Sequence, residues 1–148
     1  MAKTAQRQRP PPPPPIAAQD VSSFASVIRV FVIEDTPQMR ELLEQMLTLD
    51  DFDVVGSAAN GAAALPEMNQ ADPDVVVLDY SMPGLDGLLT ARLIREERPD
   101  QAIILYTAYL DGELEEKAGR AGIALCVEKA DGILTLERDI RRLAAGTA

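Results

Sequence analysis

Five polar residues stand at the ends of short apolar runs: Glu34, Asp35, Asp79, Thr107 and Lys129. Three of them are carboxylates, which repel one another at close range unless a cation lies among them. Oxygen ligands without sulfur or imidazole suit Mg²⁺. A carboxylate nucleophile, a metal that neutralises phosphoryl oxygens, and a hydroxyl and an ammonium that orient them could together carry out phosphoryl transfer.

These residues meet only if the apolar runs are parallel strands of one sheet, because ligands gather at the carboxyl ends of such strands. The runs are rich in β-branched residues and alternate with segments of helical periodicity, which predicts an α/β fold with helices on both faces. We expect strands over residues 27–33, 53–58, 74–78, 102–106 and 123–127, and helices over residues 37–47, 61–69, 85–93, 113–120 and 133–143.

Local signals support the helices. Thr36 and Pro37 predict an N-cap followed by proline at the first helical position, and Pro66 is the one residue that disfavours the helix around it. The apolar positions expected to face the core are Met39, Leu42, Leu43, Met46 and Leu47 in the first helix, Leu85, Leu88, Leu89 and Leu93 in the third, and Ile133, Leu136, Ile140 and Leu143 in the last.

The composition excludes several classes of function. The net charge of −10 opposes binding to phosphate backbones, so we expect no nucleic acid partner. No apolar stretch is long enough for a membrane helix, and we expect a cytoplasmic protein that does not bind membranes. The chain has no histidine and one cysteine, Cys126, which excludes a thiolate or imidazole zinc site, a Ser/His/Asp triad and a histidine phosphodonor.

The amino-terminal 25 residues differ from the rest. They contain Lys3, Arg7 and Arg9, and then six consecutive prolines over residues 10–15. Such a run favours an extended polyproline conformation and cannot pack a core. We therefore expect residues 1–25 to form a disordered, proline-rich arm, whose prolines could also be a docking motif, and residues 26–146 to form one folded domain.

Taken singly, each candidate residue has an ordinary structural explanation. Glu34 and Asp35 could complement the dipole of the helix that follows, and Asp79 could be a turn residue. Thr107 could be a β-branched strand residue, and Lys129 a solvated surface lysine. All of these groups follow strands that should end at the same edge of one sheet, and this joint pattern favours a functional site.

The segment from Val75 to Gly87, with Asp79 followed by Met82-Pro83 and Gly84, closely resembles the phosphoacceptor segment of response-regulator receiver domains. The resemblance extends over residues 27–145. It implies a flavodoxin-like sheet of strand order 2-1-3-4-5 with five helices. It also implies that the protein is a phosphoprotein of two-component, phosphorelay signal transduction.

The resemblance assigns a role to each site residue. Asp79 would accept a phosphoryl group from a histidine kinase or a histidine phosphotransfer protein. Asp35, Asp79 and the backbone carbonyl of Ser81 would coordinate Mg²⁺, with Glu34 acting through bound water. Thr107 would donate a hydrogen bond to a phosphoryl oxygen, and Lys129 would form an ion pair with it.

The sequence also departs from the family pattern. Cys126 stands where relatives often carry a switch aromatic, so the signal should pass either through Tyr109 or through loop ordering alone. Lys129 is followed by Ala130-Asp131 rather than proline, and we expect Asp131 to cap the last helix. No output domain follows, which predicts a single-domain response regulator whose downstream protein target the sequence does not identify.

Two other functions compete with this interpretation. One is a magnesium-dependent aspartyl phosphatase, which would need a second acid two residues after the nucleophile, where this chain has Ser81. The other is a receiver-like interaction module that is not phosphorylated. The combination of Asp79, Thr107 and Lys129 favours a phosphoacceptor that is not itself an enzyme.

Overall fold

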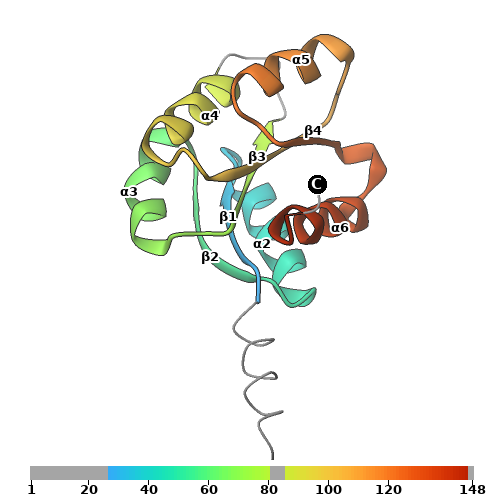
Figure 1. The fold of residues 1–148 in the computed structure, drawn as a ribbon. Helices are drawn as coiled ribbons and strands as arrows, with labels where there is room; N and C mark the ends of the chain where they lie inside the picture. Colours follow the sequence, from blue (N-terminus) through green and yellow to red (C-terminus); the bar gives the residue numbers. More distant parts are fainter. Residues whose placement is uncertain (1–26, 81–85, 147–148) are drawn as a thin grey trace, which may run out of the picture.

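A computed structural model describes residues 27–80 and 86–146, the side chain of Asp86 excepted. Its centre is one parallel sheet of five strands in the order β2-β1-β3-β4-β5 (Figure 1). The strands are β1 (Arg29–Ile33), β2 (Asp53–Ala58), β3 (Val75–Tyr80), β4 (Ala102–Thr107) and β5 (Leu125–Glu128). The order 2-1-3-4-5 confirms the predicted flavodoxin-like sheet.

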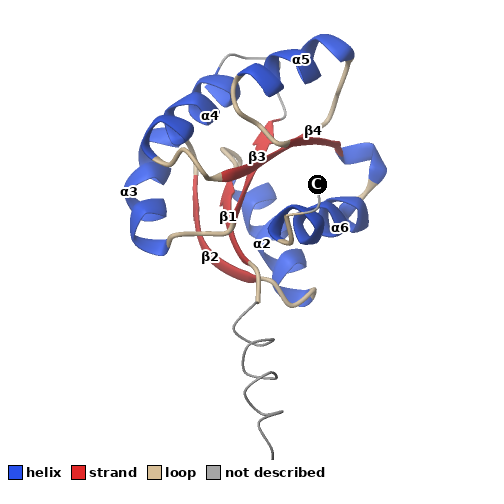
Figure 2. Cartoon of the chain, in the orientation of Figure 1, coloured by secondary structure: helices blue, strands red, loops and turns tan. Residues whose placement is uncertain are grey.

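Five α-helices are described: α2 (Pro37–Leu49), α3 (Gly61–Ala71), α4 (Asp86–Glu97), α5 (Gly112–Arg120) and α6 (Ile133–Ala144). Figure 2 shows α3, α4 and α5 on one side of the sheet and α2 and α6 on the other. In the part of the chain that the structure describes, no helix combines the length and apolar character needed to span a bilayer.

The core consists of two apolar layers, one on each face of the sheet. In β1, Phe31 and Ile33 pack into the α3, α4 and α5 layer, whereas Val30 and Val32 pack into the α2 and α6 layer. Successive strand side chains point to opposite faces, so a strand covered on both faces must be apolar throughout. Central strand β3 is buried at all six positions, including Asp79.

The helices bury a narrower stripe than the sequence pattern predicted. In α2, Leu43 and Leu47 are buried as expected, but Leu42 is 49% exposed. In α4, Ala91 and Ile94 pack on the sheet while Leu89 is 53% exposed. Met39 and Leu93 are also exposed, and Leu85 lies outside the described residues. An amphipathic helix buries one stripe, and the leucines of α2 and α4 span more than that width.

In α6 the prediction was better, because Leu136 and Ile140 are buried at the predicted spacing. The prediction that Asp131 caps this helix was wrong. Asp131 ends a short 3₁₀ helix (Lys129–Asp131), and Gly132, with φ of 90°, occupies the N-cap position without a side-chain cap. The turn needs a positive φ that glycine adopts without strain, and the carbonyl of Asp131 instead accepts a hydrogen bond from the Thr135 hydroxyl at 2.9 Å.

Two other local features need comment. Pro66 lies inside α3 and does not end it, so the second helix is confirmed. Its start is fixed by Asn60, whose side chain accepts a hydrogen bond from the backbone N–H of Ala63 at 2.9 Å. Thr36 holds the predicted N-cap position of α2, but its side chain makes no cap hydrogen bond.

Candidate functional site

Asp79 and Lys129 meet at the carboxyl edge of the sheet. Asp79 is the penultimate residue of β3, and Lys129 directly follows β5, two strands away. The ammonium Nζ of Lys129 lies 2.5 Å from Oδ1 of Asp79, whose side chain is almost fully buried. Lys129 also lies over the ring of Tyr106, with Nζ 5.6 Å from the ring centroid. The aromatic ring and the carboxylate together hold the ammonium over β4.

Glu34 contributes a second carboxyl group to this edge. Its side chain is 1% exposed, and Oε2 accepts a hydrogen bond from the backbone N–H of Thr36 at 2.5 Å. Oε1 has no hydrogen-bond donor among the described residues. Burial raises the pKa of Glu34, and its side-chain hydrogen bond with Asp79 raises that pKa further. The two carboxyl groups therefore face each other, and Asp79 disfavours ionisation of Glu34.

The backbone around Glu34 is held firmly. Its N–H donates to the carbonyl of Ala58 at 3.0 Å, and its own carbonyl accepts a hydrogen bond from Nη1 of Arg40 at 2.6 Å. Arg40 lies on α2, so the guanidinium ties the turn between β1 and α2 to the helix. The spacing of these residues gave no signal for Arg40, because the contact depends on how the turn folds back.

The structure describes three of the four predicted magnesium ligands. Glu34 and Asp79 are brought together, while the neighbouring Asp35 is exposed and accepts a hydrogen bond from the Thr36 hydroxyl at 3.5 Å. Ser81 lies outside the described residues. Within residues 27–80 and 86–146, no group of three or more Cys, Asp or Glu side chains is arranged to hold a metal. The buried Oε1 of Glu34, without a donor and beside Asp79, fits an oxygen-ligated cation.

Thr107 is positioned differently from Lys129. Its buried hydroxyl donates to the carbonyl of Tyr109 at 3.1 Å and lies 3.3 Å from the N–H of the same residue. The hydroxyl is thus committed to the loop that follows β4, and its predicted contact with a phosphoryl group stays a prediction. The side chain of Tyr109 is 70% exposed.

Cys126, at the expected switch position, is half-buried against the layer formed by α3, α4 and α5. Burial raises the pKa of its thiol to about 11, with a smaller contribution from the charge of Glu115. The thiol is therefore neutral and packs as a small apolar group. Transmission of the signal through Tyr109 or through loop ordering alone stays a prediction.

Gly87 explains part of the segment around Asp79. A Cβ atom on Gly87 would lie 2.3 Å from Cδ1 of Tyr80, the last residue of β3. Only glycine allows the first turn of α4 to lie this close to the Tyr80 ring. The glycine of the sequence motif therefore has a packing role that places α4 beside the carboxyl end of β3.

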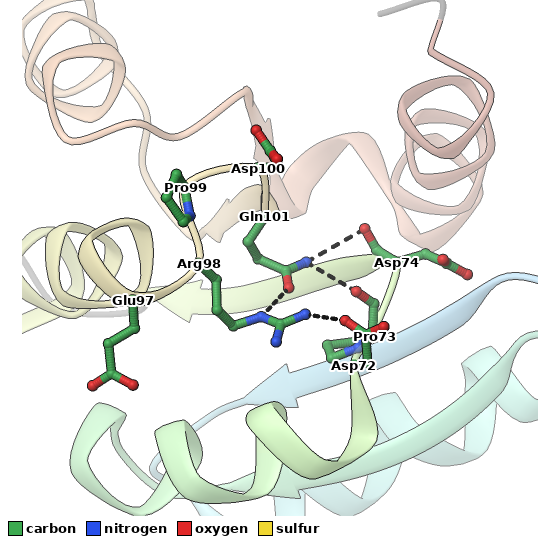
Figure 3. Close-up of a pocket in the computed structure, with 8 residues that line it drawn as sticks. All are labelled: Asp72, Pro73, Asp74, Glu97, Arg98, Pro99, Asp100 and Gln101. Carbon is green, nitrogen blue, oxygen red and sulfur yellow. Dashed lines mark hydrogen bonds and ion pairs between the residues drawn. The ribbon is translucent and has the colours of Figure 1, made fainter.

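An open pocket of ≈ 430 Å³ lies elsewhere, at the amino edge of the sheet. Its residues come from the connections that lead into β3 and β4 (Figure 3). It includes none of the predicted site residues. Of the residues chosen from the sequence, Glu34, Asp79 and Lys129 come together at the carboxyl edge, and the amino-edge pocket is a separate feature.

Comparison with known proteins decides the family. The model of the response regulator receiver domain matches residues 30–141, which include every described residue of the site. The chain belongs to this receiver domain family. The receiver domain of the putative response regulator NarL from Mycobacterium tuberculosis has a TM-score of 0.71 and 32% identity, covering 80% of this chain and 97% of that one. A LuxR-family response regulator from Aurantimonas sp. has a TM-score of 0.75 and 27% identity, covering 81% and 86%.

Other relatives of this receiver domain are longer proteins. A protein-glutamate methylesterase/protein-glutamine glutaminase from Syntrophus aciditrophicus is 39% identical over 118 residues, which are 78% of this chain and 33% of that protein. Response regulator GacA from Pseudomonas viridiflava is 31% identical over 81% of this chain and 56% of that protein. The receiver domain thus spans about a third of the methylesterase relative and about half of GacA.

Proposed function

We propose that this receiver domain accepts a phosphoryl group on Asp79 and passes the signal on through protein interactions. The donor is a phosphohistidine of a histidine kinase or of a histidine phosphotransfer protein. The observation that carries the proposal is the convergence of buried Asp79, buried Glu34 and the Lys129 ammonium at one edge of the sheet.

Each residue has a defined part in the transfer. An Oδ atom of Asp79 attacks phosphorus, the N–P bond of the phosphohistidine breaks, and its electron pair stays on the imidazole as an acyl phosphate forms. Lys129, already 2.5 Å from Asp79, pairs with the charge of the phosphoryl oxygens. Thr107 turns from the backbone of Tyr109 to donate to one of these oxygens.

Glu34, Asp35, Asp79 and the backbone carbonyl of Ser81 would hold Mg²⁺ at this edge. When bound, the metal supplies positive charge that offsets repulsion between the carboxylates and the phosphoryl group. The unpartnered Oε1 of Glu34 supports this ligand set, because it is a buried carboxyl oxygen without a hydrogen-bond donor among the described residues.

The downstream role of the phosphorylated receiver domain is an interaction with a target protein. Its long relatives named as methylesterases match this chain over only about a third of their length, so that named activity belongs to them. A net charge of −10 supports protein targets over nucleic acid.

Labelling with a small phosphodonor such as acetyl phosphate tests the proposal. We expect labelling that requires Mg²⁺, disappears in Asp79→Asn, and is unchanged in Asp53→Asn, an exposed aspartate at the start of β2. Labelling of Asp79→Asn at the unchanged level, or equal labelling in excess chelator, contradicts the assignment. Complete absence of labelling in the unchanged chain favours the interaction module that is not phosphorylated.

A further inference from the structure

The loop after β4 is held by two side chains on the face of the sheet covered by α5. The Thr107 hydroxyl bonds both the carbonyl and the N–H of Tyr109, at 3.1 and 3.3 Å. One residue further on, the backbone N–H of Leu110 donates to Oε2 of Glu128 at 3.4 Å. Glu128 is the last residue of β5, directly before Lys129.

Register explains why Glu128 can reach this loop. Thr107 and Glu128 are paired across β4 and β5, as Leu105 and Cys126 are two residues earlier. Paired residues of parallel strands point to the same face, so Glu128 points to the side where the loop turns toward α5. Lys129, one residue on, points to the opposite face and reaches Asp79. Glu128, the last residue of β5, thus contacts the loop, and Lys129, in the turn after β5, contacts the phosphoacceptor Asp79.

We propose that Glu128 is a positioning residue that holds the β4–α5 loop in the conformation in which Thr107 is committed to Tyr109. This inference rests on the proposed phosphorylation of Asp79. For Thr107 to reach a phosphoryl oxygen, its bonds to Tyr109 must break and the loop must shift. Leu110 lies in the same loop, and its bond to a carboxylate anchored on β5 opposes that shift. Glu128 therefore sets how much of the protein is ready to hold a phosphoryl group.

The test compares Glu128→Ala with Glu128→Gln, which keeps an acceptor oxygen, and with Glu115→Ala, which removes an exposed carboxylate of α5 that makes no bond to the loop. Each full-length variant is titrated with beryllium fluoride, a phosphoryl mimic, in Mg²⁺, and the exchange rate of the Leu110 amide is measured without it. A role that is only structural would lower thermal stability without raising affinity for the mimic.

We expect Glu128→Ala to bind beryllium fluoride about three- to tenfold more tightly and to exchange the Leu110 amide faster, as follows from loss of one hydrogen bond in the resting state. The affinity of Glu128→Gln for beryllium fluoride and its Leu110 exchange rate should lie between those of Glu128→Ala and the unchanged protein. Both values of Glu115→Ala should equal those of the unchanged protein. Unchanged or weaker binding by Glu128→Ala overturns the proposal. If the unchanged chain does not bind the mimic at all, phosphorylation of Asp79 is wrong, and unaltered Leu110 exchange in Glu128→Ala would separately show that Glu128 does not hold the loop.

Discussion

At the amino edge of the sheet, both polar atoms of the buried Gln101 side chain have hydrogen-bond partners. Its Nε2 donates to the carbonyls of Pro73, Asp74 and Ala102 at 3.2, 3.4 and 3.2 Å. Its Oε1 accepts from Nε of Arg98 at 2.9 Å, as Figure 3 shows. Arg98 continues the network with an ion pair to Asp72, and this pairing lowers the pKa of Asp72.

At the carboxyl edge one buried side chain, that of Glu34, is not matched in this way. Oε1 of Glu34 has no donor among the described residues, and the carboxyl group faces another acid, Asp79. Buried polar groups cost free energy when they lack partners, so proteins tolerate them mainly where they have a function. From this difference we expect the amino edge to contribute stability, and it is consistent with the ligand role proposed for the carboxyl edge.

The largest effect that this comparison predicts is on Gln101. Gln101→Ala removes one donor group from three carbonyls and leaves Arg98 without its neutral acceptor. We expect the free energy of unfolding to fall by about 2–3 kcal/mol, the range for breaking a buried hydrogen-bond network. Labelling of Asp79 by the phosphodonor should persist under all conditions in which the variant is folded. Urea unfolding measures the first effect.

The control for Gln101 is Gln70→Ala, which truncates an exposed glutamine on α3 and should change stability by less than about 0.5 kcal/mol. Equal stabilities of the Gln101 and Gln70 variants would show that the amino-edge network does not stabilise the fold.

A second prediction concerns Glu137, a buried residue of α6 close to Asp50 at the end of α2. Burial, and then its side-chain hydrogen bond with Asp50, raise the pKa of Glu137 to about 7. Arg141 bonds Oδ2 of Asp50 at 2.7 Å and lies over Phe52, 4.6 Å from the ring centroid. Protonated Glu137 therefore hydrogen-bonds Asp50 and joins α6 to the end of α2.

Because the pKa of Glu137 is raised in the folded state, its protonated form stabilises the fold. This stability is complete below pH 4.5 and is lost as the pH rises to about 7. We expect the unfolding free energy to decline by about 1–2 kcal/mol over that window, and to decline less in Glu137→Gln. The chain has no histidine that titrates there. Identical pH profiles of the two proteins in urea titrations would contradict the raised pKa of Glu137.

The smallest effect is expected for Glu34→Gln, and its sign is opposite to that of Gln101→Ala. Glutamine keeps an acceptor for Thr36 and can donate to Asp79, so it removes the unpartnered carboxylate. We expect stability above pH 7 to rise by about 1 kcal/mol, while stabilisation by added Mg²⁺ is lost. The rise should shrink as the pH falls, because the raised pKa of Glu34 favours the neutral form of its carboxyl group at lower pH.

Glu41→Gln is the matched control for that change, since Glu41 is an exposed acid of α2. It should leave both stability and the Mg²⁺ response unaltered. A Glu34→Gln variant less stable than the unchanged protein above pH 7 would mean that Glu34 is well paired, which removes the contrast between the two edges.

Sequence reasoning identified the sheet because its signals are local: β-branched runs ending in polar residues alternate with helical periodicity. It also predicted that Asp79, Glu34 and Lys129 lie at one edge, since the ends of parallel strands share one edge; their roles stay predictions. It could not identify contacts that depend on side-chain reach, such as Glu128 with Leu110, because the register between β4 and β5 appears only in the folded sheet. For the same reason it did not single out Gln101, an isolated glutamine with two of its partners, backbone carbonyls, 27 and 28 residues away.

The most direct test of the account is to locate the phosphoryl group by chemical trapping. The full chain is treated with acetyl phosphate and Mg²⁺, reduced with borohydride, and digested for mass spectrometry. An acyl phosphate is reduced to the alcohol, so an aspartyl phosphate becomes homoserine. The account predicts homoserine in place of Asp79 alone, and none when Mg²⁺ is chelated. Homoserine at Asp35, or an unmodified Asp79 under conditions in which the protein is labelled, would contradict it.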